Sequence, residues 1–218
     1  MEKHESVRII GFGDSITQGN IETNGAWPQE LQVKLDNLNQ GAYEVINKGI
    51  NGNTTASGFD RFEGDIIPNL PGILIVAFGI NDCNHREWAK VPRVSVAEYE
   101  KNIREFHRVT TLKGGCCIFV VNHILQPLEG SRFLNQGNAQ TYQENIEIYN
   151  STVRKLSGEL NVPIIDFPKH ISEKSIDVQS LLIEDGVHLS RYGYTVYTEY
   201  IFQCLKELGL LNKYLESL

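Results

Sequence analysis

The sequence predicts an α/β protein with three layers, in which a five-stranded parallel sheet has helices on both faces. The first observation is that short apolar runs alternate with amphipathic helical stretches along the chain, which is typical of strand–helix–strand units. The second is that the apolar runs suit strands buried on both faces of a parallel sheet. The third is the length of 218 residues without internal repeats, which favours one domain over residues 1–218.

The apolar runs place the strands. In chain order they are Val7–Phe12, Tyr43–Ile46, Ile73–Phe78, Cys116–Asn122 and Pro163–Asp166. The amphipathic stretches place the helices. In chain order these are Trp27–Asn37, Thr54–Ile67, Val96–Thr111, Thr141–Leu160 and Arg191–Leu208. Ser190 can cap the last helix, so the residues just before it are expected in a loop at the carboxyl edge of the sheet.

Composition and charge exclude several classes of protein. Hydrophobic residues make up 41% and charged residues 22%, which is ordinary for a soluble globular enzyme. The formal charge of −7 includes no Lys/Arg cluster, which argues against nucleic acid or an anionic membrane as partner. The polar segment Met1–Ser6 leaves no room for a signal peptide, and the apolar runs are too short to span a bilayer. We therefore expect a cytoplasmic protein without membrane insertion.

Four cysteines do not form the pattern of a disulfide framework. Cys116 and Cys117 are adjacent on a predicted strand, so they point to opposite faces and are expected to be buried thiols. Cys204 lies in a helical stretch, and Cys83 is a candidate for exposure near the functional site. Their spacing does not suggest a zinc site.

A serine and a distant histidine are the most informative residues of the chain. Ser15 lies in Gly13-Asp14-Ser15-Ile16-Thr17, directly after the first strand, where the chain turns helical. Serine is a weak nucleophile that needs an adjacent base, usually an imidazole oriented by a carboxylate. Asp185-Gly186-Val187-His188 provides both groups. The alternative is structural, with Ser15 as a helix cap and Asp185-Gly186 as a turn.

Two further segments offer hydrogen-bond donors for the oxyanion that forms when an acyl carbonyl is attacked. Asn47–Gly52 follows the second strand and Gly79–Asp82 follows the third, so both are expected at the same sheet edge as Ser15. Gly49 is predicted to donate a backbone N–H and Asn81 a side-chain amide. The alternative is that the glycines are turn residues and Asn81 bonds its own loop.

Together these segments resemble the SGNH (GDSL) hydrolase family, whose marker residues are a serine, a glycine, an asparagine and a histidine in separate blocks. The markers map to Ser15, Gly49, Asn81 and His188. The blocks stand in the family's order, the first at residues 11–19 and the last at 185–193. The resemblance is closest to bacterial short-chain ester and carbohydrate acetylesterase members.

The resemblance implies the flavodoxin-like SGNH hydrolase fold and a serine esterase without metal or cofactor. It implies a catalytic triad of Ser15, His188 and Asp185, and an oxyanion hole formed by Ser15, Gly49 and Asn81. Two nearby carboxylates are alternatives to Asp185 as the partner of the histidine. For these, the structural interpretation is that Asp14 bonds turn amides and Asp82 braces the loop that contains Asn81.

The compact length, without an evident lid helix, favours short acyl groups such as acetyl, on a small-molecule or carbohydrate alcohol. An O-acyltransferase would share the first half-reaction, and a lysophospholipase or thioesterase would share the fold. A non-catalytic binding module is disfavoured because no phosphate-binding glycine loop follows a strand.

Substrate contacts are predicted in the loops Cys83–Ser95 and His123–Asn138, because long loops at this edge often determine specificity. Trp88 and Phe133 are candidates for an acyl or sugar pocket, with packing beneath the loops as the alternative. His123 either contacts substrate or is a loop histidine with its hydrogen bonds satisfied, and Asp14 borders the nucleophile. A homo-oligomer stays open, with 208–211 as a candidate contact or simple helix-end packing.

Overall fold

The computed structural model describes residues 6–20, 24–86, 88–126 and 139–213. Five parallel strands form one sheet in the order β2-β1-β3-β4-β5. They are β1 (Val7–Gly13), β2 (Tyr43–Gly49), β3 (Ile73–Ala77), β4 (Cys116–Val121) and β5 (Ile164–Asp166). The predicted parallel sheet is confirmed, and the largest difference is at β2, which continues past Ile46 to Gly49.

Each predicted helix has a counterpart whose ends differ by at most a few residues. The long helices are α2 (Trp27–Leu38), α3 (Thr55–Asp65), α4 (Val96–Leu112), α5 (Ala139–Leu160) and α8 (Arg191–Glu207). Short ones are α1 (Ser15–Gln18), the 3₁₀ turn η1 (Ile67–Asn69), α6 (Phe167–Glu173), α7 (Val178–Leu181) and α9 (Leu210–Lys213). Ser190 caps α8 as predicted, because its side chain accepts a hydrogen bond from the Gly193 N–H.

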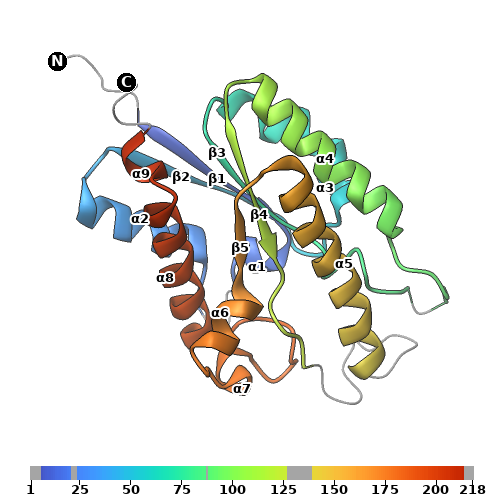
Figure 1. The fold of residues 1–218 in the computed structure, drawn as a ribbon. Helices are drawn as coiled ribbons and strands as arrows, with labels where there is room; N and C mark the ends of the chain where they lie inside the picture. The colour runs from blue at the N-terminus through green and yellow to red at the C-terminus, as the bar shows by residue number, and fades with distance from the viewer. Residues whose placement is uncertain (1–5, 21–23, 87, 127–138, 214–218) are drawn as a thin grey trace.

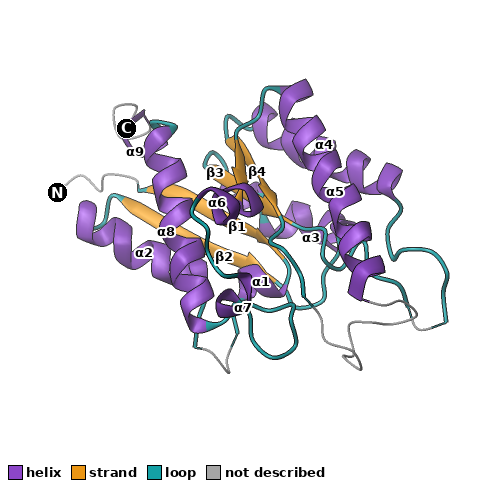
Figure 2. Cartoon of the chain, turned by 60° about the horizontal axis from the view of Figure 1, so that its bottom comes forward, coloured by secondary structure: helices purple, strands orange, loops and turns teal. Residues whose placement is uncertain are grey.

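The helices form a layer on each face of the sheet (Figure 1). One layer contains α2 and α8, and the other contains α3, α4 and α5. This is the three-layer α/β/α arrangement predicted from the sequence. Figure 2 turns the carboxyl edge of the sheet towards the viewer, where α1 and α7 lie beside the strand ends.

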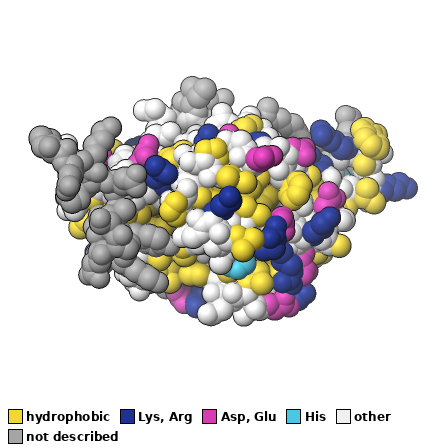
Figure 3. Space-filling model, turned by 90° about the horizontal axis from the view of Figure 1, so that it is seen from above, with side chains coloured by type: hydrophobic (Ala, Val, Ile, Leu, Met, Phe, Trp, Pro, Cys, Tyr) yellow, Lys and Arg dark blue, Asp and Glu magenta, His cyan; other side chains and the backbone are white. Residues whose placement is uncertain are grey.

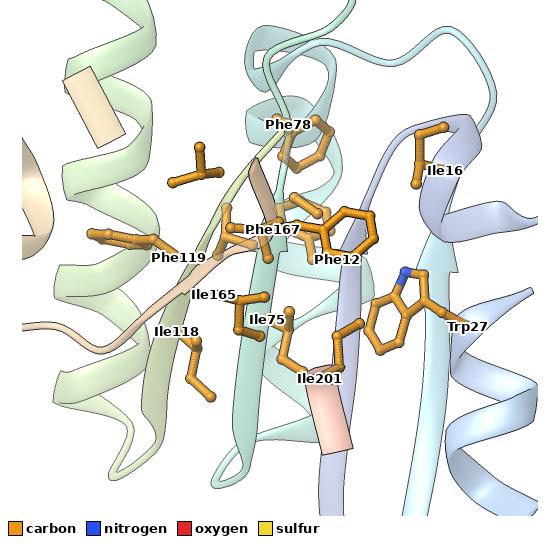
Figure 4. Packing of buried hydrophobic residues seen from close by; sticks show 14 of the residues in the cluster. Phe12, Ile16, Trp27, Ile75, Phe78, Ile118, Phe119, Ile165, Phe167 and Ile201 are labelled. Atoms are coloured by element: carbon orange, nitrogen blue, oxygen red, sulfur yellow. The ribbon is translucent and has the colours of Figure 1, made fainter. Parts of the chain in front are cut away.

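The interior strand β1 packs on both layers (Figure 4). On one side, the Phe12 ring lies edge-on to Phe62, Phe78 and Phe106, with ring centroids 5.6, 4.9 and 5.2 Å away. On the other side, Gly11 allows the fully buried Trp27 to approach the strand, since a Cβ on Gly11 would lie 2.7 Å from Trp27 Cζ2. These contacts fix the position from which the chain leaves β1 and enters α1.

Arg61 on α3 joins the carboxyl ends of β1 and β2. Its Nη2 donates to the carbonyls of Gly13 at 3.1 Å and Lys48 at 2.9 Å. Its Nε donates to Asn53 Oδ1 and its Nη1 to Asp65 Oδ2, both at 2.8 Å. The guanidinium therefore holds in register the two strand ends next to the candidate nucleophile.

Arg61→Met is expected to lower the free energy of unfolding by about 2–3 kcal/mol, because it removes four partly buried hydrogen bonds, to Gly13, Lys48, Asn53 and Asp65. Only 16% of the Arg61 side chain is exposed. Urea denaturation followed by circular dichroism measures the loss. The control is Arg108→Met, since Arg108 is exposed on α4 and, among the described residues, pairs only with Glu105, and exposed pairs of this kind contribute little to stability. Equal losses in the two variants would contradict the role given to Arg61.

The protein surface and the cysteine thiols bear on further predictions from the sequence. Within the described ranges, no helix is long and apolar enough to cross a membrane. Figure 3 shows the face opposite the carboxyl edge, where basic, acidic and hydrophobic side chains are interspersed. Cys83 is buried, and its Sγ donates to the Ile80 carbonyl at 3.3 Å, so the expected exposure is wrong. Leu210 and Leu211 are also buried, which matches helix-end packing.

Candidate active site

Ser15 is the first residue of α1 and directly follows the turn after β1. The turn is tight and requires glycine at position 13. A Cβ on Gly13 would lie 2.5 Å from the Ala77 carbonyl oxygen. Asp14 caps α1 by accepting a hydrogen bond from the Ile16 N–H at 3.0 Å. The first N–H groups of a helix have no acceptor within the helix, so this turn exposes a hydroxyl beside a backbone donor.

The structure brings Ser15, His188 and Asp185 together. His188 Nε2 lies 2.9 Å from Ser15 Oγ, and His188 Nδ1 lies 2.6 Å from Asp185 Oδ2. Asp185 Oδ1 also accepts from the backbone N–H groups of Val187 at 2.8 Å and His188 at 2.9 Å. Although partial burial raises the pKa of Asp185, the hydrogen bonds from His188 and these amides hold that pKa below its ordinary value. An ionised carboxylate therefore orients the imidazole at neutral pH.

His123 supports the loop that contains His188. It is buried, and its Nε2 lies 2.7 Å from the Val187 carbonyl oxygen. Burial lowers the pKa of His123 to about 4, so the neutral ring donates to that carbonyl. The Gln126 N–H adds a second link, donating to the Gly186 carbonyl at 2.7 Å. This position matches the alternative of a satisfied loop histidine and not the predicted substrate contact.

The two other carboxylates brace the site from below. Asp14 is buried, and burial, with the charge of Asp82 as a smaller contribution, raises its pKa to about 7. Asp82 Oδ1 accepts from the backbone N–H of Thr55 at 2.8 Å and from its hydroxyl at 2.5 Å, and burial raises the pKa of Asp82 to about 6. Both residues occupy the structural positions that the sequence suggested as alternatives, with Asp14 on a turn amide and Asp82 between the loop and α3. Asp14 thus lies beneath the nucleophile rather than in a substrate pocket.

Gly49 is not placed to serve as the predicted oxyanion donor. It is the last residue of β2, and its N–H donates to Asn47 Oδ1 at 2.9 Å. Its Cβ would lie 2.1 Å from the Gln18 nitrogen, so its lack of a side chain allows α1 to approach β2. Gly52, in the loop beyond, has a left-handed φ of +73° and open space at its Cβ position. In the described part of the chain, the Gly52 N–H has no acceptor.

Arg93 is a site residue that the sequence reasoning missed. Its Nη1 donates to Asn81 Oδ1 at 3.3 Å, and its Nη2 donates to the Gly52 carbonyl at 2.9 Å. On its other side, Asn81 Nδ2 lies 3.4 Å from Asp14 Oδ2. Only an arginine in a loop rich in polar residues is visible in the sequence, which gives no signal for this bridge.

An exposed tryptophan and a polar hollow lie on the side of the site where substrate is expected. Trp88 is 84% exposed on the loop between β3 and α4, so it does not pack beneath that loop, and Phe133 lies outside the described residues. A polar hollow of about 310 Å³ lies between the end of α1 and the start of α8, lined by Gln18, Asn20, Gln29, Glu30 and Arg191 among others. Two of these lining residues are paired, since Arg191 Nη1 donates to Glu30 Oε1 at 2.5 Å. No cluster of three or more metal-ligating side chains occurs among the residues the structure describes.

The structure thus combines an α/β/α fold with a hydrogen-bonded serine, histidine and aspartate at the carboxyl edge of its sheet. The model of the GDSL-like lipase/acylhydrolase family matches residues 12–196. This match spans most of the chain, so the chain belongs to the GDSL-like lipase/acylhydrolase family and is a carboxylic ester hydrolase.

Similar proteins cover nearly the whole chain. An uncharacterized lipoprotein, YqeF, of Bacillus subtilis is 28% identical over 207 residues, covering 85% of this chain and 84% of the relative. An acetylxylan esterase of Geobacillus stearothermophilus is 26% identical over 220 residues, and the match covers 93% of this chain and 94% of that relative. The crystal structure of a lipase/acylhydrolase from Enterococcus faecalis superposes with a TM-score of 0.75 at 22% identity, over 92% of this chain and 96% of that one. This likeness shows that the fold is shared.

Proposed function

We propose that the protein is a serine esterase that hydrolyses short-chain esters, acetyl esters first, through an acyl-enzyme on Ser15. The observation that supports this most directly is the continuous chain of hydrogen bonds from Ser15 Oγ through His188 to Asp185, at 2.9 and 2.6 Å. A nucleophile, its base and the group that orients the base are then in contact before substrate arrives.

In the proposed mechanism, His188 Nε2 takes the Ser15 proton while Ser15 Oγ attacks the ester carbonyl. The resulting imidazolium is stabilised by the Asp185 carboxylate. The tetrahedral intermediate collapses, and His188 protonates the departing alcohol, which leaves an acyl-enzyme. Water then attacks the acyl carbonyl and gives its proton to His188, and the acid departs as the Ser15 hydroxyl is restored.

For the oxyanion, we propose the Ser15 N–H, the Asn81 Nδ2 and the Gly52 N–H as donors. Gly52 replaces Gly49 because the Gly49 N–H already donates to Asn47 Oδ1. Gly52 is joined to Asn81 through Arg93, so the two candidate donors belong to one connected unit. Donors fixed before the reaction lower the energy of the developing charge without reorganisation.

We propose a small polyhydroxylated alcohol, such as a sugar, as the alcohol part of the substrate. The polar hollow begins at Gln18, three residues along the same helix from Ser15, and its size lies at the small end of the range of roughly 300–1,000 Å³ for small-molecule sites. The exposed Trp88 offers an apolar face on the loop between β3 and α4. The acetylxylan esterase among the relatives supports the same substrate class. A cytoplasmic location stays a prediction, since another relative is named a lipoprotein.

The purified protein should hydrolyse p-nitrophenyl acetate with a higher kcat/KM than p-nitrophenyl decanoate, because the described site contains a small polar hollow. A p-nitrophenyl series from acetate to decanoate measures the preference, and a fluorophosphonate probe reports the reactive serine. Higher activity on decanoate would contradict the short-chain proposal. Labelling without hydrolysis, followed by product formation on addition of an acceptor alcohol, would favour an acyltransferase instead.

A further inference from the structure

Arg93 connects two loops that leave the carboxyl edge on either side of β1. One loop follows β2 and contains Gly52, and the other follows β3 and contains Asn81. The guanidinium spans the gap between them, donating to the Gly52 carbonyl and to Asn81 Oδ1. Two of the proposed oxyanion donors, those of Gly52 and Asn81, lie outside α1. Arg93 therefore hydrogen-bonds an oxygen atom of each of these two residues.

The backbone around Arg93 is anchored independently of any substrate. The Arg93 N–H donates to the Asn84 carbonyl at 2.8 Å, and the Val94 N–H donates to the Asp82 carbonyl at 3.2 Å. The Tyr149 hydroxyl of α5 donates to the Val94 carbonyl at 2.5 Å. The base of the side chain is thus held by its own loop and by α5, and the guanidinium extends from a fixed point.

This contact determines which end of the Asn81 amide faces the nucleophile. The two ends of an amide are similar in shape but opposite in polarity, and arginine has donors only. Arg93 therefore bonds Oδ1, and Nδ2 is directed to the other side, where it lies 3.4 Å from Asp14 Oδ2 in the turn that leads into Ser15. The positive charge of the Arg93 guanidinium next to Oδ1 also polarises the amide, which strengthens the Nδ2–H as a donor.

We propose that Arg93 is a positioning residue for ester hydrolysis, fixing the Asn81 amide and the Gly52 loop so that their N–H groups face the oxyanion formed at Ser15. This inference rests on the proposed serine esterase function. Arg93 does not touch the reacting atoms. Its effect reaches them through the orientation of the two donors, so it should change the rate of the chemical step more than substrate binding.

The test compares Arg93→Met and Arg93→Lys with wild type on p-nitrophenyl acetate. Arg93→Met is expected to lower kcat by about 10- to 100-fold with little change in KM, less than the 10²- to 10³-fold typical for losing an oxyanion donor itself. Arg93→Lys should recover part of this loss, because one ammonium can reach one of the two acceptors. The control is Arg108→Met, since Arg108 is exposed on α4 and pairs with Glu105 there, and it should leave kcat unchanged.

A double-mutant cycle with Asn81→Ala identifies the route of the effect. If Arg93 acts mainly through Asn81, adding Arg93→Met to Asn81→Ala should cost far less than Arg93→Met costs in wild type. An unchanged kcat in folded Arg93→Met, or a higher KM at constant kcat, would each overturn the positioning role. Losses that multiply fully would overturn the part of that role assigned to Asn81. Thermal melting of each variant checks that the comparison is made on folded protein.

The rate of fluorophosphonate labelling separates failure of this inference from failure of the proposed function. In labelling, Ser15 Oγ attacks the phosphorus of the probe and displaces fluoride through a similar charged transition state, so labelling should slow in Arg93→Met as hydrolysis does. Active wild type with an equally active Arg93→Met overturns the inference alone. Wild type that neither hydrolyses the ester nor reacts with the probe overturns the proposed function and, with it, this inference.

Discussion

Ser15→Ala is expected to lower kcat for p-nitrophenyl acetate by about 10⁶-fold and to abolish fluorophosphonate labelling, because it removes the atom that forms the acyl-enzyme. His188→Ala should cause a comparable loss, and the double variant should be no worse than either single one, since the two residues act as a unit. Steady-state hydrolysis with an active-site titration measures the effect. The control is Ser151→Ala, an exposed serine of α5 that bonds only Glu147 in the described structure.

Asp185→Asn tests the third member of this unit. The substituted amide can donate to the histidine ring and favour the wrong tautomer, for which a loss of about 10⁴-fold in kcat is typical. An Asp185→Asn variant with near wild-type kcat would assign the orienting role to another group. Activity that survives Ser15→Ala would contradict the whole mechanism.

Asp14 is expected to lower stability as pH rises from 4 to 8, and Asp14→Asn should remove that contribution. His123, whose pKa burial lowers to about 4, contributes in the opposite direction in wild type and in the variant alike. Burial raises the pKa of Asp14 from 3.8 to about 7. Between these values the unfolded chain has released the proton while the folded protein retains it, so the unfolded state binds fewer protons and unfolding becomes easier as pH rises. Three pKa units correspond to about 4 kcal/mol. Asp82, whose burial raises its pKa to about 6, contributes in the same direction.

Urea denaturation at pH 4 and pH 8 measures this effect. The asparagine should keep the acceptor for the Ile16 N–H, so the variant is expected to match wild type near pH 4 and to exceed it by a few kcal/mol near pH 8. Asp60→Asn is the matched control, since the Asp60 carboxylate is exposed on α3, and should preserve the wild-type slope. A wild-type slope in Asp14→Asn would mean that the folded protein holds Asp14 ionised at neutral pH.

The sequence was sufficient for the strands of the sheet and the helices between them, because apolar runs and amphipathic stretches mark these elements locally. The family resemblance was sufficient to predict that Ser15, Asp185 and His188 meet, although Ser15 and His188 are 173 positions apart. The sequence was insufficient at the end of β2. Asn47 and Lys48 are polar, and on an edge strand such residues continue the ladder without being buried. Ending the strand at Ile46 placed Gly49 in a loop, whereas it pairs with Gly13 inside the sheet.

The remaining differences depend on contacts between distant segments. His123 meets Val187 across 64 positions of sequence, and Arg93 meets Gly52 across 41. Neither pairing leaves a periodic or local signal. Short helices such as α7, with four residues, are also too brief to show a helical period. For Trp88, the sequence could not distinguish a packed side chain from an exposed one, since both are compatible with a tryptophan in a long loop.

The contacts of His123 and Gln126 with the 186–187 turn have a consequence for exchanging specificity between relatives. The first residues after β4 are hydrogen-bonded to the segment that contains His188, so they belong to the catalytic framework even though they begin a loop predicted to contact substrate. A transplanted loop that includes His123 would alter the base of the reaction together with the substrate preference. Chimeras should therefore retain residues 122–126 and join the foreign segment after Gln126.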